Sequence, residues 1–296
     1  MKNIIAKLSL RTLKSLKSLK TLKSLTALAA IVCCQTSCVK ETLYDTDHPN
    51  HGKIISLTTD WTDKSGDIAI PGSYTVKIGD YTTTLLGTTN EVNNYFEAGT
   101  YHINIWNTAE HIAVSGTTAT ADYSNGLLGW FFTGTENVTV EKDKDHAFTV
   151  PMHQQVRQLT LELEITGDAK DRLTGIEASL SGVAGAISID NGNPVGDAAA
   201  IALDFTRRDA INRVSTIRLL GITGNVQTLT LTLHFEGGNP SSYTVTSDLA
   251  SGLAAFNADK KTPLTLHSIL VITPTQTGFT ATIDPWIENG GNVIAN

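Results

Sequence analysis

The chain has 296 residues, of which 41% are hydrophobic and only 6% aromatic, and its formal net charge at pH 7 is −7. The first 37 residues hold seven of the 22 basic side chains and no acidic one, which leaves 15 basic against 29 acidic side chains, or a net charge of −14, in residues 38–296. Such a body repels phosphate backbones and anionic lipid, so we predict no nucleic-acid partner. Its hydrophobic content suffices for one large or two ordinary domains.

Residues 1–37 have the layout of an export signal. Basic side chains from Lys2 to Lys23 precede the apolar run Leu25–Val32. This run is shorter than the roughly 20 apolar residues of a membrane-spanning helix, and small residues follow it. The Leu-Lys-Ser repeats at 13–25 offer an alternative, an amphipathic helix on a membrane surface. The apolar run favours a lipoprotein signal peptide instead.

All three cysteines, Cys33, Cys34 and Cys38, lie within six residues of one another, and none follows. In a bacterial export signal, a cysteine after small residues at the cleavage point receives a diacylglyceryl group. We predict that Cys38 is this lipidated residue, with 38–52 as the tether. Cys33 or Cys34 stays an alternative because Gln35 stands where an apolar residue is usual. The mature protein is then held on a membrane through its acylated N-terminal cysteine.

Beyond the tether, apolar and polar residues alternate with a period of two in many short runs. Runs of this kind, rich in Thr, Val, Ile and Tyr and separated by Asn-Gly, Gly-Asn and Gly-Gly turns, predict antiparallel sheets with one solvent-exposed face. Only residues 248–259 suggest a short helix or an irregular crossover. We therefore predict an all-β fold of two tandem antiparallel β-sandwich domains, with strands at 53–61, 74–78, 100–106, 111–115, 138–140, 147–150, 159–165, 186–189, 202–205, 226–235, 243–245, 264–266, 269–272 and 279–283.

The boundary between the two sandwiches is predicted near Pro151–Gln158, which divides the chain into domains 53–153 and 154–296. A change in composition supports this boundary, because no arginine lies between Cys38 and Val156 while six of the seven arginines follow. The first of these, Arg157, is interpreted as an exposed structural residue, with a pairing role across the domain interface as the alternative.

A search for reaction chemistry finds no nucleophile elbow, phosphate loop or zinc-protease motif. His48 and His51, with Asp45 and Asp47 before them, have a spacing suggestive of a metal site, but a solvated tether explains them better because a specific site needs a closed ligand set. Residues 141–145 are expected to form a charged hairpin tip and not a calcium loop. We predict no enzyme activity, no metal and no cofactor.

Aromatic residues raise one further possibility. Leu127–Phe132 is the densest apolar cluster outside the signal, and with Trp61 and Trp106 it is either a platform on which a sugar ring stacks or part of the core. Core packing is favoured, because a chain with few aromatic residues needs them inside. The platform defines an alternative function, a surface-exposed glycan- or host-binding lipoprotein.

Several segments carry a resemblance to a known family. Ser37–Glu41 resembles the lipidation site of surface lipoproteins from Bacteroides-like bacteria. Thr59–Trp61, Ile70–Val76 and Glu97–Asn107 resemble, in that order, the first domain of the FimB-type minor fimbrial subunits. The strands from Leu159 onward look like the second domain of that family, but their sequence motifs are less specific.

This resemblance implies a lipid-anchored base or accessory subunit of a type V fimbria, built from two transthyretin-like sandwiches. Such a protein fastens the polymer of major pilins to the cell outer membrane and limits its length. In that family, stalk pilins lose their first strand to an arginine-directed protease, and a neighbour's C-terminal strand fills the resulting groove. An anchor keeps its first strand, which agrees with the absence of arginine between Cys38 and Val156.

The C-terminal stretch 278–296 is the candidate for a donated strand, with a pair of glycines as its hinge. Alternating residues of this stretch share one face, as strand donation requires. The alternative is a plain last strand of the second sandwich followed by a frayed tail. The donor-strand residues are predicted to be Phe279, Ala281, Ile283 and Trp286.

Overall fold

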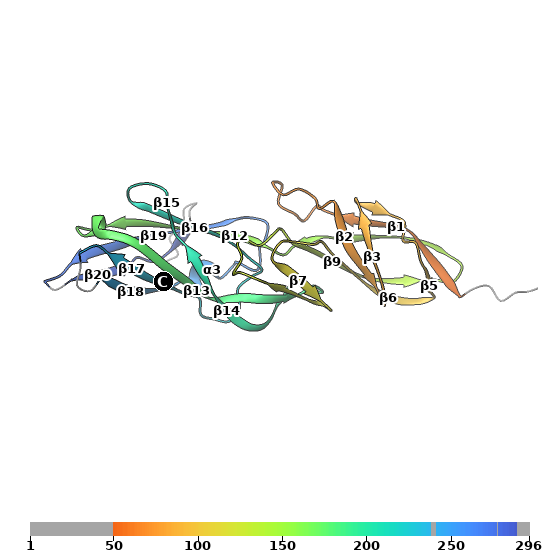
Figure 1. Ribbon diagram of the computed structural model, residues 1–296. Coiled ribbons are helices and arrows are strands. Elements are labelled where there is room, and N and C mark those ends of the chain that lie inside the picture. The colour runs from red at the N-terminus through yellow and green to blue at the C-terminus, as the bar shows by residue number, and fades with distance from the viewer. Residues whose placement is uncertain (1–49, 238–240, 277, 289–296) are drawn as a thin grey trace, which may run out of the picture. The chain divides into compact units, whose positions relative to one another are not determined.

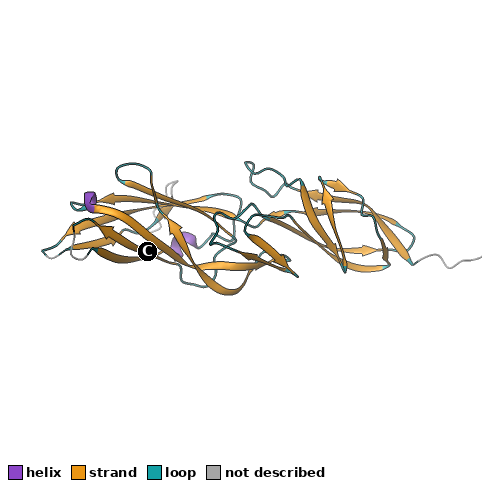
Figure 2. Ribbon diagram, in the orientation of Figure 1, coloured by secondary structure: helices purple, strands orange, loops and turns teal. Residues whose placement is uncertain are grey.

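The computed structural model describes residues 50–237, 241–276 and 278–288 (Figure 1). The signal peptide, Cys38 and nearly all of the predicted tether lie outside these residues. Figure 2 shows strands throughout the described chain and only short helical turns, of which the structure gives a 3-10 turn at Lys170–Arg172 and helix α3 at Ala250–Leu253. The predicted all-β class is confirmed, and α3 lies within the segment 248–259 that was predicted as a short helix or crossover.

Two sheets, which share one hydrophobic core, use strands from the first part of the described chain. One has the order β10-β1-β4, with β5 also paired to β1, and the other has the order β11-β9-β6-β2-β3. The strands are β1 (His51–Asp60), β2 (Ser73–Ile78), β3 (Tyr81–Leu86), β4 (Thr89–Asn90), β5 (Tyr95–Glu97), β6 (Gly99–Trp106), β9 (Phe132–Val140), β10 (Asp145–Pro151) and β11 (His153–Gln154).

Two further sheets enclose a second core. One has the order β15-β16-β12-β19-β20, with β21 also on β19, and the other has the order β18-β17-β13-β8-β7, with β14 also on β13. The strands are β7 (Ile112–Ser115), β8 (Thr118–Ala121), β12 (Arg157–Thr166), β13 (Leu173–Ser188), β14 (Pro194–Asp204), β15 (Thr206–Arg207), β16 (Asn212–Leu219), β17 (Thr228–Phe235), β18 (Ser242–Asp248), β19 (Leu264–Pro274), β20 (Phe279–Ile283) and β21 (Ile287–Glu288).

Most strand pairs are antiparallel, but two are parallel: β1 with β10, and β12 with β19. In both cases an early strand lies beside a strand that comes much later in the chain. The strands between the two partners belong to other sheets as well as to their own. The alternation of residues that predicted these strands carries no information on this pairing.

Alternation of buried and exposed side chains explains both cores. In β12, every second residue from Arg157 to Ile165 is buried, and the residues between are half-buried. The first core contains Ile54, Leu57, Val76, Ile103 and Phe132, and the second contains Leu161, Leu231, Leu266 and Phe256. Burial of such side chains contributes about 1.5–3 kcal/mol each, so sheet burial holds both sandwiches.

The hairpin β7–β8 joins a sheet from the other part of the chain. Although its residues lie inside the predicted first domain (53–153), β8 pairs with Ala186–Ser188 of β13. A third hydrophobic cluster lies beneath it and includes Leu128, Phe131, Val156 and Ile187. The domain division at 153/154 stays a prediction, and this hairpin is the segment whose hydrogen bonding cuts across it.

The segment that follows β11 is held by buried polar side chains. Arg157 is 5% exposed. Its Nε donates to the carbonyl of Thr262 (2.6 Å) and its Nη1 to that of Phe256 (3.0 Å), while its guanidinium lies 5.0 Å from the ring centre of Phe256. The interpretation of Arg157 as an exposed residue is therefore wrong: the main-chain carbonyls of the loop after α3 satisfy it.

Lys260 lies in the same region. Its Nζ donates to Oε1 of Gln155 (2.9 Å) and to the carbonyl of Gly192 (3.2 Å). Burial lowers the pKa of Lys260 to about 8, because low-dielectric surroundings disfavour the charged form. Gln154 also docks here, donating to the carbonyl of Lys260 at 2.7 Å. Lys260 thus links Gln154 and Gln155 to the loop that contains Gly192.

Candidate functional site

Strand β1 is the element that decides whether the first sandwich is open or closed. It pairs in parallel with β10 on one side, from Lys53 to Asp60, and with β4 and β5 on the other. Ile54 and Leu57 on this strand are completely buried. Both edges and the inner face of β1 are thus occupied by the chain itself.

Close approach of main chains fixes the start of β1. A Cβ atom on Gly52 would lie 2.4 Å from the carbonyl oxygen of Glu141 and 2.6 Å from a methyl carbon of Val140. The amide of Lys53 donates to the carbonyl of Lys144 at 3.0 Å, and that of Asp143 to the carbonyl of His51 at 2.9 Å. Glycine is required at position 52 because only it lets β1 lie this close to the β9–β10 turn.

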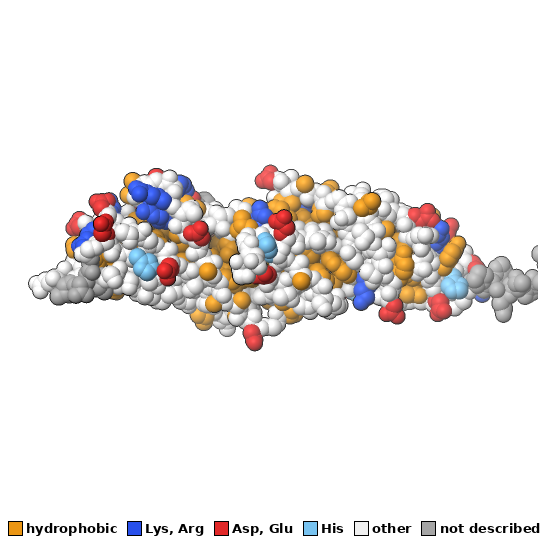
Figure 3. Space-filling model, viewed as in Figure 1, with side chains coloured by type: hydrophobic (Ala, Val, Ile, Leu, Met, Phe, Trp, Pro, Cys, Tyr) orange, Lys and Arg blue, Asp and Glu red, His pale blue; other side chains and the backbone are white. Residues whose placement is uncertain are grey.

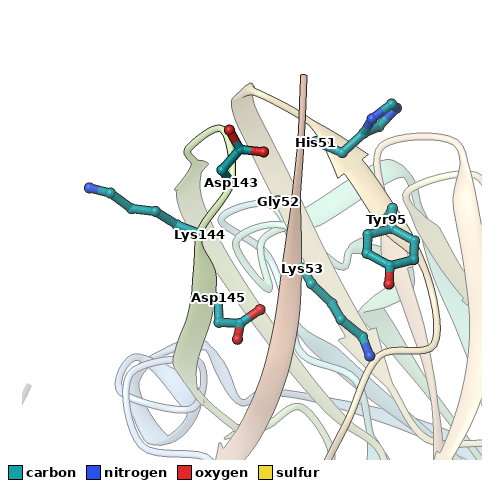
Figure 4. A pocket seen from close by; sticks show the side chains of 7 residues that line it. All are labelled: His51, Gly52, Lys53, Tyr95, Asp143, Lys144 and Asp145. Carbon is teal, nitrogen blue, oxygen red and sulfur yellow. The ribbon is translucent and has the colours of Figure 1, made fainter. Parts of the chain in front are cut away.

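A pocket of about 500 Å³ opens where the described chain enters β1. In Figure 4, Lys53 on β1 and Asp145 on β10 come from adjacent strands, Tyr95 stands on the other side of β1, and Lys144 points away. Nζ of Lys53 lies 5.8 Å from the centre of the Tyr95 ring. The remaining lining residues are His51, Gly52 and Asp143.

Ion pairs within the chain engage both lysines that line this pocket. Lys53 forms an ion pair with Glu91, and this hydrogen bond raises the pKa of Lys53 above its usual range. Lys144 pairs with Glu141 in the charged turn before β10. This turn joins β9 to β10, which belong to different sheets, so it is not the hairpin tip expected from the sequence. Across the described residues, no three His, Cys, Asp or Glu side chains gather as metal ligands, and His48, Asp45 and Asp47 lie outside the described residues.

The four candidate donor-strand residues lie within or beside strands of this chain's own second sandwich. Phe279 and Ala281, each 5% exposed, and the half-buried Ile283 share the inner face of β20, which pairs with β19. The ring of Phe279 stacks on Phe235 at 4.6 Å. Trp286 is 4% exposed, and its Nε1 donates to Oγ of Ser247 at 3.0 Å. Donation of this strand to another subunit therefore requires it to leave β19.

The aromatic side chains considered as a sugar platform are largely inside. Phe131 and Phe132 are completely buried and Trp61 is 8% exposed, with its ring edge-on to Phe132 at 5.3 Å. Trp130 is half-buried, and the guanidinium of Arg218 lies 4.2 Å from its ring centre. A stacked cation takes the place that a sugar ring would need, so these residues support core packing.

Several features of this site carry no sequence signal. The parallel β1–β10 pair and the pocket at its start depend on register, which a single sequence does not give. Gly52 was identifiable as a lone glycine at the start of an alternating run, a pattern that indicates close backbone approach.

None of the helices in the described residues has the length and hydrophobicity needed to span a membrane.

Comparison with known proteins gives similarity in structure only. No protein-family model matches the chain, and no curated protein matches it significantly. A candidate adhesin from Bacteroides ovatus superposes with a TM-score of 0.58 and 10% identity, covering 81% of this chain and 96% of its own. Another from the same species gives a TM-score of 0.54 and 13% identity, covering 68% and 84%.

The fimbrial anchor protein Mfa2 from Porphyromonas gingivalis matches with a TM-score of 0.53 and 10% identity, covering 81% of this chain and 98% of that protein. At such identities the likeness concerns the fold. The chain therefore has the β-sandwich fold of these Bacteroides-type fimbrial and adhesin structures, and the expected resemblance is confirmed at the level of the fold.

Proposed function

We propose that this chain is a non-enzymatic surface lipoprotein that acts as the membrane-anchoring or accessory subunit of a fimbria. Its fold is shared with a protein named as a fimbrial anchor and with candidate adhesins. Its described residues include a pocket lined by charged side chains and Tyr95 at the start of β1. Other fimbrial subunits, in particular a major pilin, are its proposed partners.

The closed first sandwich is the observation that carries this proposal. A repeating subunit needs an open groove to accept its neighbour's strand, and here β1 fills that place with ladders on both edges. No arginine lies between Cys38 and Val156, so an arginine-directed protease has no site from which to release β1. A subunit that accepts no strand in its first sandwich ends a polymer, as a base does.

Attachment is proposed to run through Cys38, which lies outside the described residues. The described fold begins at residue 50, so a short tether connects the lipidated cysteine to β1. Two or more acyl chains are about what stable membrane anchoring requires. The proposed location is the outer face of the outer membrane.

Replacing Cys38 tests the anchor in cells that assemble fimbriae. We expect Cys38→Ala to release both the protein and its fimbriae into the medium, measured by immunoblotting of cell and medium fractions. Cys33→Ala and Cys34→Ala are the matched controls and should leave both on the cell. Release of the protein while the fimbriae stay on the cell would contradict an anchoring role.

A further inference from the structure

The first four residues of β13 have a strand on one side only. Strand β17 pairs with β13 from Leu173, whereas β14 pairs with it only from Glu177 onward. Beyond Asp204 the chain crosses to the facing sheet, where β15 pairs with β16. Among the described residues, no strand covers residues 173–176 on the side away from β17. Main-chain groups left at such an edge are a template for pairing with another chain.

Two arginines beside this edge have no carboxylate partner among the described residues. Nε of Arg207 donates to the carbonyl of Asp209 at 3.0 Å, and Nη1 of Arg213 donates to the carbonyls of Asp209 and Asn212, each at 3.2 Å. Both residues therefore use neutral acceptors. By contrast, Arg208 in the same hairpin pairs with Glu162 at 2.6 Å.

The carboxylate of Asp209 acts on Arg213 through its charge, but its hydrogen bonds go to other groups of the same hairpin. It accepts hydrogen bonds from the main-chain amides of Ile211 and Asn212 and from Nδ2 of Asn212, and these bonds keep its pKa below the usual range. The pKa of Arg213 is lowered first by burial and then by the charge of Arg207, and the opposing effect of Asp209 is smaller than either. The two guanidinium groups are thus close enough to repel each other, and an anion between them would relieve the repulsion.

The unpaired edge and the two arginines line one pocket of about 190 Å³. Its walls are β13 residues 173–176, Arg207 and Arg213, and the buried ring of Phe205 also lines it. The volume corresponds to about six water molecules at liquid density, enough for one side chain that carries a carboxylate. Figure 3 shows Lys and Arg side chains gathered where Figure 1 labels β15. Such a group stands out in a body whose net charge is −14.

We propose that this corner of the second sandwich binds an extended acidic peptide segment of another protein. The segment adds as a short strand to residues 173–176 of β13 and places a Glu or Asp carboxylate between Arg207 and Arg213. Main-chain hydrogen bonds position the segment, and the charge-assisted bonds to the guanidinium groups select for acid. This site is separate from the closed first sandwich and does not depend on the proposed anchoring role.

An acidic peptide fits these observations better than an acidic sugar does. Both ligands would neutralise the arginines, but only an extended peptide carries N–H and C=O groups at the spacing of the strand edge formed by residues 173–176. The edge is short, so it favours a local contact of a few residues over a long inserted strand.

Titration with synthetic peptides tests the proposal on the purified full chain. The probe is the peptide Thr-Val-Glu-Val-Glu-Val-Thr, and its matched control carries Gln in place of both Glu residues. Binding is followed by amide nuclear magnetic resonance, with fluorescence anisotropy for affinity. We expect the Glu peptide to bind at least about tenfold more tightly than the Gln peptide, since hydrogen bonds between two charged groups are stronger than those to a neutral amide. The amide signals of Thr174, Gly175 and Ile176 should shift.

Variants separate the two arginines from general charge. The double variant Arg207→Gln/Arg213→Gln should lose the preference for the Glu peptide, whereas Arg208→Gln should keep the wild-type affinity within about twofold, because Arg208 already has a carboxylate partner. Unchanged circular dichroism and melting temperature would show that both variants fold. Equal binding of the two peptides, or of the peptide to wild type and double variant, would overturn the proposal. Binding of a galacturonic acid oligosaccharide without binding of the peptide would overturn it as well.

Discussion

Gly52 lets β1 lie close to the β9–β10 turn because its side chain is only a hydrogen atom. Because an added methyl would meet the carbonyl of Glu141 and the side chain of Val140, we expect Gly52→Ala to lower the free energy of unfolding by about 1–3 kcal/mol, the usual cost of overpacking. Urea denaturation measures this difference. Gly72→Ala is the control, since its Cβ would meet nothing within 4 Å, and equal losses in the two variants would argue against a special role for Gly52.

Lys260 gives the stability of the protein a specific pH dependence. Its pKa of about 8 in the folded chain lies below the ordinary 10.5, so between these two values the unfolded chain binds more protons and stability rises with pH. We expect the free energy of unfolding of the wild type, relative to Lys260→Met, to be flat below pH 8. Above pH 8 it should rise by up to about 1.4 kcal/mol per pH unit, as measured by chemical denaturation.

Lys261→Met is the matched control for this experiment. The hydrogen bond of Lys261 with Asp63 raises the pKa of the lysine, so its titration lies above the window of Lys260. The difference in free energy of unfolding between wild type and each variant decides the matter. If it grows between pH 8 and 10 for Lys261→Met but not for Lys260→Met, the lowered pKa does not belong to Lys260.

At the scale of elements, the C-terminal stretch is either a strand donated to another subunit or the last strand of the second sandwich. Truncation separates these two roles. Removing 286–296 deletes β21 and the buried Trp286, and should lower the free energy of unfolding by about 3–5 kcal/mol, the cost of a large aromatic deletion. Removing 289–296 deletes none of the described residues and is the control. If the strand is donated, the longer truncation also ends co-purification with a major pilin, and unchanged recovery would remove the donor idea.

Strands were the most predictable elements, and their partners the least. The alternating run 159–165 predicted most of β12, and 279–283 matches β20, because a half-buried strand must alternate. The parallel pairing of β1 with β10 and the pairing of β8 with β13 join residues far apart in sequence, and alternation does not encode which strands meet. Arg157 was misjudged for a related reason: its carbonyl partners belong to a loop about 100 residues away.

For the whole molecule, composition and alternation were enough to predict the all-β class, and sequence motifs led to the fimbrial fold likeness. The candidate site was predicted only in part. The absence of arginine between Cys38 and Val156 agreed with a retained first strand. The ladders on both edges of that strand, and the pocket shared by Arg207 and Arg213, follow from three-dimensional proximity. Cys38, the predicted attachment point, stays a prediction.

The two parallel strand pairs have a mechanical consequence for a protein held by its N-terminus. If the chain is anchored as proposed, tension enters at the start of β1 and leaves the first sandwich at the end of β10, which are opposite ends of one parallel ladder. A ladder pulled in this way is loaded in shear, so its hydrogen bonds resist together instead of opening one after another. The pair β12 and β19 repeats the arrangement in the second sandwich. Each sandwich thus contains one parallel strand pair that would resist such tension in shear.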